Sequence, residues 1–160
     1  MPVMEGVQVT KLIGAVLSIA ITAGGQAPAK PNFTGDWKMN AAKSDFGLLP
    51  PPASIRRTIT HAEPNLTIVE DQRSDMGDAS ATRKYVTDGT PTTFTAQGAE
   101  VNGSAKWDEN TLVVNSKVDA IGLSFSDKMT LSPDGNMLMS NIHISSPQGD
   151  IDIMIAFDKQ

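Results

Sequence analysis

Residues 121–131 read Ile-Gly-Leu-Ser-Phe-Ser-Asp-Lys-Met-Thr-Leu, the most regular alternation of apolar and polar residues in the chain. Side chains of an extended strand point alternately to opposite faces, so every second residue shares a face. One face carries Leu123, Phe125, Asp127, Met129 and Leu131. The other face carries only serine, lysine and threonine after Gly122. This period of two predicts a β-strand with one face toward a core.

The same period continues on both sides of this stretch, and turn residues such as Asp88-Gly89 and Pro133-Asp134-Gly135 separate the segments. We expect further strands over residues 33–39, 55–61, 66–72, 81–86, 92–96, 100–108, 111–118, 137–145 and 151–159. Regular short strands predict an all-β antiparallel up-and-down meander of about 8–10 strands. We favour a closed barrel over a sandwich, because closure removes exposed strand edges and leaves space inside for a ligand.

Composition limits the classes of partner. The chain has 160 residues, a formal net charge of −5 and no cysteine. An acidic surface repels nucleic acid and anionic membranes, so we expect neither as a partner. The absence of cysteine excludes disulfides, thiolate chemistry and a lipoprotein anchor. The sequence therefore predicts one globular domain without a stable membrane anchor, and it leaves the oligomeric state open.

The N-terminal segment has the features of a signal peptide. Lys11 precedes an apolar run over residues 12–23, and small residues follow it. A bilayer-spanning helix needs about 20 apolar residues, so this run is too short to span and suits a signal-peptide core. We therefore expect residues 1–27 to be a signal peptide and residues 28–160 to be a single barrel domain. The mature protein is then periplasmic or secreted.

Gly35-Asp36-Trp37 opens the first expected strand, and a long proline-rich connection over residues 40–54 follows it. With the meander that follows, this pattern resembles the lipocalins and their relatives, the calycin barrels. The resemblance implies that Gly35 and Trp37 form the barrel floor and that residues 40–54 cover the mouth. Lipocalins usually place an arginine against that tryptophan, where this chain has only Lys159 in its last strand. The resemblance is thus to a lipocalin-like barrel.

A second resemblance covers residues 33–47, the three prolines at 50–52 and residues 131–135. These stretches are similar to a group of uncharacterised exported proteins of soil bacteria. That similarity implies export and transfers no activity.

The inward faces suggest a ligand site and no metal, cofactor or catalytic site. Arg57 and His61 share a face with two isoleucines, and a buried arginine needs a carboxylate partner, such as Asp127, or an anionic ligand group. The ligand-binding residues we expect are Arg57, His61, Tyr85, Phe125, Met129 and Met139. The acidic stretch over residues 70–78 does not have the spacing of a calcium loop, and we interpret it as a solvated loop.

Three functions remain open at this point. The leading hypothesis is an exported barrel that binds a small apolar or amphipathic molecule, with an acidic group as one option. The alternative is a cell-envelope interaction module with a filled core. The third is an enzyme that uses His61 or His143 with Asp127 as acid and base, and it requires two of these groups within reach of each other in a pocket.

Overall fold

The computed structural model describes residues 28–160, and the expected signal peptide lies outside the described residues. Ten strands form one antiparallel sheet, with two short 3-10 turns between them. The strands are β1 (Gly35–Met39), β2 (Ser54–Ala62), β3 (Asn65–Arg73), β4 (Ala79–Val86), β5 (Thr92–Ala96), β6 (Ala99–Asp108), β7 (Thr111–Val118), β8 (Leu123–Leu131), β9 (Met137–Ser146) and β10 (Gly149–Lys159). The 3-10 turns are η1 (Ala41–Lys43) and η2 (Asp119–Ile121). The expected all-β meander is confirmed.

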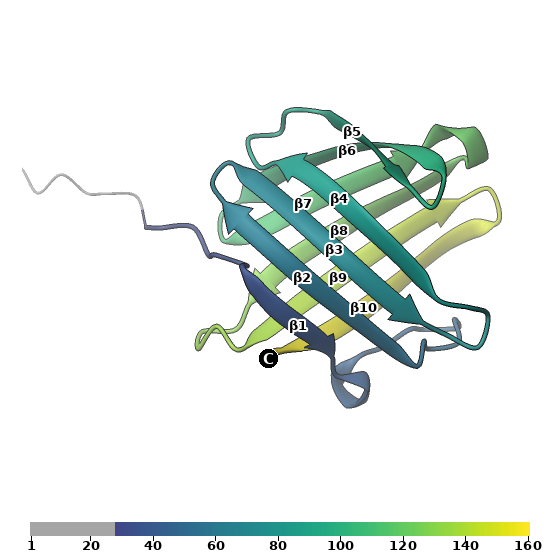
Figure 1. Cartoon of the computed structure of the whole chain (residues 1–160), viewed down its shortest axis with the longest axis horizontal. Helices are drawn as coiled ribbons and strands as arrows, with labels where there is room; N and C mark the ends of the chain where they lie inside the picture. The colour runs from purple at the N-terminus through teal and green to yellow at the C-terminus, as the bar shows by residue number, and fades with distance from the viewer. Residues whose placement is uncertain (1–27) are drawn as a thin grey trace, which may run out of the picture.

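The first and last strands pair, and this pairing curls the sheet into a barrel. The strand order is β4-β3-β2-β1-β10-β9-β8-β7-β6-β5, and Trp37 lies opposite Lys159 in the β1–β10 ladder. Figure 1 shows β1–β4 crossing in front of β7–β10, with β5 and β6 completing the wall at the top. The edges of the described sheet are therefore β4 and β5. The Thr92 hydroxyl donates a hydrogen bond of 2.9 Å to the Lys84 carbonyl across this seam.

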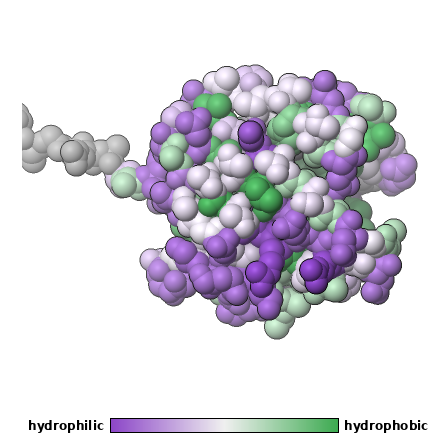
Figure 2. Space-filling model, in the orientation of Figure 1, coloured by the Kyte–Doolittle hydropathy of each residue, from purple (hydrophilic) through white to green (hydrophobic). Residues whose placement is uncertain are grey.

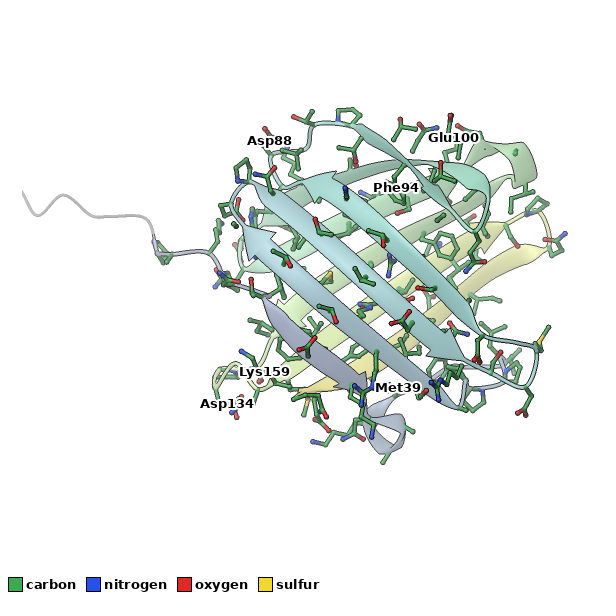
Figure 3. The ribbon with its side chains drawn as sticks, viewed as in Figure 1. Met39, Asp88, Phe94, Glu100, Asp134 and Lys159 are labelled. Carbon is green, nitrogen blue, oxygen red and sulfur yellow. The ribbon has the colours of Figure 1, made fainter. Side chains whose placement is uncertain are left out.

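Up-and-down topology gives the barrel two different ends. The closed end holds the start of β1, the end of β10 and the β2–β3, β4–β5, β6–β7 and β8–β9 turns. The open end holds the long β1–β2 connection and the other four turns. In Figure 3, Asp88, Asp134 and Lys159 mark the closed end, and Met39 and Glu100 mark the open end.

Alternation decides which side chains fill the barrel. On β2, Ile55, Arg57, Ile59 and His61 are buried while the residues between them are exposed. The outer face over β1–β4 is mainly hydrophilic or neutral, with scattered hydrophobic residues (Figure 2). The expected strand over residues 121–131 begins two residues late, because Gly122 adopts a left-handed conformation at φ 64° and ends η2. No helix within residues 28–160 is long and apolar enough to span a bilayer.

Candidate ligand cavity

The closed end is filled by aromatic side chains around Trp37. Trp37 is 1% exposed, and its indole N–H donates a 2.9 Å hydrogen bond to the Phe33 carbonyl. The Lys159 ammonium lies 5.6 Å from the centre of the Trp37 ring, in the place where lipocalins usually have an arginine. A Cβ atom on Gly35 would lie 3.1 Å from the Lys159 side chain, which favours glycine there. Gly35 and Trp37 therefore lie at the closed end, where the resemblance places the barrel floor.

His61 belongs to this closed end. Its ring lies 5.8 Å from Phe33 and 6.0 Å from Trp107, centre to centre. Its Nδ1 accepts a hydrogen bond from the Phe33 backbone N–H, and its Nε2 lies 2.8 Å from the Glu63 carboxylate. These contacts place the proton on Nε2 and use both ring nitrogens in holding the closed end together.

A charged layer crosses the middle of the barrel. It consists of Arg57 on β2, Glu70 on β3, Arg83 on β4 and Asp127 on β8, with the Ser140 hydroxyl of β9. Glu70 Oε2 accepts hydrogen bonds of 2.5 Å from Arg57 Nε and 2.8 Å from Arg83 Nη2. Arg57 Nη1 lies 3.3 Å from Asp127 Oδ2 and donates to Ser140 Oγ at 2.9 Å. Arg57 therefore has two carboxylate partners, Glu70 and Asp127, of which the sequence suggested Asp127 as one option.

The protein shifts the pKa values of the two carboxyl groups of this layer in opposite directions. Burial alone would raise the pKa of Glu70, but the guanidinium groups of Arg83 and Arg57 outweigh it and hold the pKa at about 2. Burial also raises the pKa of Asp127, and there Arg57 and the Ser140 hydroxyl do not offset it. The two guanidinium groups therefore share one firmly ionised carboxylate, Glu70, and a second carboxyl group, Asp127, whose ionisation is disfavoured by burial.

Arg83 has a side-chain donor without a hydrogen-bond partner. Its Nε is the one buried side-chain polar atom within residues 28–160 that has no hydrogen-bond partner. The side chain is 22% exposed and lines a cavity above the charged layer. A buried N–H without a partner costs free energy. A ligand in the cavity can contact the exposed part of the Arg83 side chain.

The open-end cavity has a volume of about 260 Å³. The polar residues that line it are Arg57, Glu70, Gln72, Arg83, Ser116 and Asp127. The apolar residues of the barrel that line it are Ile55, Val114, Phe125, Ile142, Ile144, Ile153 and Ile155. Phe46, Leu49, Pro50 and Pro52 cover it from the β1–β2 connection, which is where the resemblance places the mouth loop. Backbone bonds of 2.7 Å in both directions between Asp45 and Met154 fasten this loop to β10.

The structure brings only part of the expected ligand set together. Arg57 and Phe125 line the cavity. His61, Tyr85 and Met129 are buried in the barrel but lie outside the cavity lining, and the Tyr85 hydroxyl is 2.7 Å from Ser116 Oγ. Met139 does not face the interior, because its neighbours Leu138 and Ser140 are the fully buried residues of β9. Met139 thus lies on the outer face, and the prediction that it lines the ligand site is wrong.

The structure also differs from two other expectations, the solvated loop over residues 70–78 and the pairing of a histidine with Asp127. Residues 70–78 are not wholly a solvated loop, since Glu70 points inward and belongs to the charged layer. Each histidine has a carboxylate partner other than Asp127. His61 contacts Glu63, and the exposed His143 bonds Asp152 at 2.7 Å on the outer face. Neither histidine is therefore paired with Asp127, as the third hypothesis requires.

A ten-stranded, nearly closed barrel with a cavity at one end is a calycin-type barrel. Zebrafish ileal bile acid-binding protein, solved with cholic acid, has this fold with a TM-score of 0.58 at 15% identity over 80% of this chain and 98% of that chain. Fatty-acid-binding protein 1 of Echinococcus granulosus gives 0.54 at 12% identity over 79% and 96%. A secretory abundant heat soluble protein of Ramazzottius varieornatus gives 0.59 at 11% identity over 80% and 95%. These identities establish a shared fold. No family model and no curated protein matches the sequence.

Proposed function

We propose that the barrel binds a small amphipathic acid in the open-end cavity, with the acid group on Arg83 and Arg57 and the carbon tail toward the mouth. The observation that carries this proposal is the Arg83 guanidinium, whose side chain is 22% exposed and lines the cavity beside Arg57, in a layer whose guanidinium groups outnumber its firmly ionised carboxylates. Charge-assisted hydrogen bonds to a carboxylate are about twice as strong as neutral ones.

The cavity walls supply the rest of the binding energy. Aliphatic and aromatic side chains surround the space above the arginines, so burial of ligand carbon contributes about 25 cal/mol per Å². Two of the similar structures support this assignment by their names, one as a fatty-acid-binding protein and one as a bile acid-binding protein holding cholic acid. An interaction module with a filled core would need no such cavity.

Calorimetric titration of the full chain with octanoate and with octanamide tests the proposal. We expect octanoate to bind at least about tenfold more tightly near pH 7, because only the acid offers a charged acceptor to Arg83. Arg83→Gln should remove most of this difference. Lys84→Gln, an exposed neighbour on the same strand, should leave it intact. Failure of both compounds to bind the wild-type protein, or equal affinity for them, would rule out the proposed site.

We further propose that the protein is exported and works in the periplasm or outside the cell. The support is the apolar run over residues 12–23 after Lys11, together with the similarity to exported soil-bacterial proteins described above. Expression of the full chain in a bacterium should yield an extracytoplasmic product whose intact mass corresponds to a start between about residues 26 and 30. A cytoplasmic product of full-length mass would contradict export without bearing on ligand binding.

A further inference from the structure

Only the part of the barrel toward the open end is hollow. Large side chains fill the closed half, and those that are at most 1% exposed there include Trp37, Leu112, Met129, Leu138 and Phe157. The charged layer occupies the middle, where the Arg57 guanidinium lies 4.6 Å from the centre of the Phe157 ring. A ligand that enters from the mouth therefore stops at the charged layer.

The remaining space is short. Ile142 and Ile153 are neighbours in the β9–β10 ladder, so they lie side by side on one wall of the cavity. Branched side chains of this kind have few alternative rotamers, so they give that wall a fixed shape. Phe46 and Leu49 close over the outer end. The carbon tail thus runs from the arginines past this wall to the β1–β2 connection.

We propose that the site selects short monocarboxylates and that carbons beyond about the eighth add nothing to the affinity. This inference rests on the proposed function and adds the size of the ligand to it. From Ser140 in the charged layer to Ile144 at the outer end of the cavity, β9 advances four residues, about 13 Å at ~3.3 Å per residue, roughly the length of an extended eight-carbon acid. Drug-sized ligands usually occupy cavities of about 300–1,000 Å³, so this one is small for its class. A monocarboxylate is favoured because Arg83 is 22% exposed while Arg57 is 2% exposed, so the charged layer offers the cavity one accessible guanidinium group.

Affinity measured along a series of straight-chain acids provides the test. Each methylene buried in the cavity should tighten binding about fourfold from butanoate to near octanoate. From octanoate to hexadecanoate the affinity should stay level, because the added carbons extend past Leu49 into water. Calorimetry or competition with a displaceable dye gives the constants, with the full chain held near pH 7 and each acid below its micelle concentration.

A variant with a larger cavity provides a second test of the size limit. Ile142→Ala removes three carbon atoms from the cavity wall and makes room for ligand carbon, so the break in the series should move outward by up to about three carbons. Asn141→Ala, its exposed neighbour on the same strand, should leave the break in place. Should Ile142→Ala fail to fold, Ile142→Val offers a smaller shift, and the wild-type series decides the question without either variant.

Three outcomes separate the two proposals. A break near octanoate supports the short-acid site. Affinity that keeps rising through hexadecanoate overturns the size limit and leaves acid binding standing. Absence of binding at every length overturns the proposed function itself, and the size limit with it.

Discussion

Trp37→Ala is expected to lower the free energy of unfolding by about 4 kcal/mol, because truncating a buried tryptophan typically costs about 3–5 kcal/mol. The indole is 1% exposed and fills the closed end. Its removal leaves a void and also deprives the Phe33 carbonyl of its 2.9 Å hydrogen bond. Both losses fall where the chain enters β1, so we expect them to weaken the barrel closure through β1 and β10.

Denaturant unfolding followed by circular dichroism measures this effect. Lys38→Ala on the same strand is the matched control, because Lys38 is exposed, and a surface change should stay within about 0.5 kcal/mol. Trp37→Phe should fall between the two, since it keeps an aromatic ring but has no N–H to donate. A loss of less than about 1 kcal/mol in Trp37→Ala would mean that the closed end does not hold the barrel together.

Much of the fold can be read from local patterns. The period of two places all ten strands, because each strand has one face in the core and one in water. The 3-10 turn at η2 is missed for a local reason, since the period of two through residues 121–131 does not show that Gly122 turns left-handed. The pairing of β1 with β10 can be inferred only from the general advantage of closing an edge, because no residue pattern specifies a partner so distant in sequence.

The site is less accessible to sequence reasoning. Arg57 and Asp127 are identified because each interrupts an apolar face. Glu70 and Arg83 are missed because they lie among other polar residues, where a charge does not stand out. Leu66, Ile68 and Glu70 are alternate residues of one strand and share its inward face. This alternation could have identified Glu70. Met139 misleads in the opposite sense, since an apolar side chain lies outside while Ser140 lies inside.

The charged layer leads to the second large effect. Glu70→Gln should cost about 3 kcal/mol near pH 7, while Asp127→Asn should cost much less. The pKa of Glu70 falls from 4.5 to about 2 on folding, and each unit corresponds to about 1.4 kcal/mol. Removing one partner of a buried ion pair costs a similar amount, about 3–5 kcal/mol. Asp127 has a pKa raised by burial, so folding disfavours its charged form, and its replacement by a neutral amide loses less than it does at Glu70.

The signs of the two pKa shifts predict opposite pH profiles. A lowered pKa stabilises the fold above the unfolded value and loses that contribution as the pH falls, so the cost of Glu70→Gln should shrink between about pH 4.5 and 2. A raised pKa stabilises the fold at low pH and loses that contribution as the pH rises, so Asp127→Asn should improve relative to wild type as the pH rises above 3.8. Each substitution removes one negative charge, so the variants control for net charge. Unfolding measured from about pH 3 to 7 should therefore give profiles that diverge, and parallel profiles would mean that Arg83 and Arg57 do not favour Glu70 over Asp127.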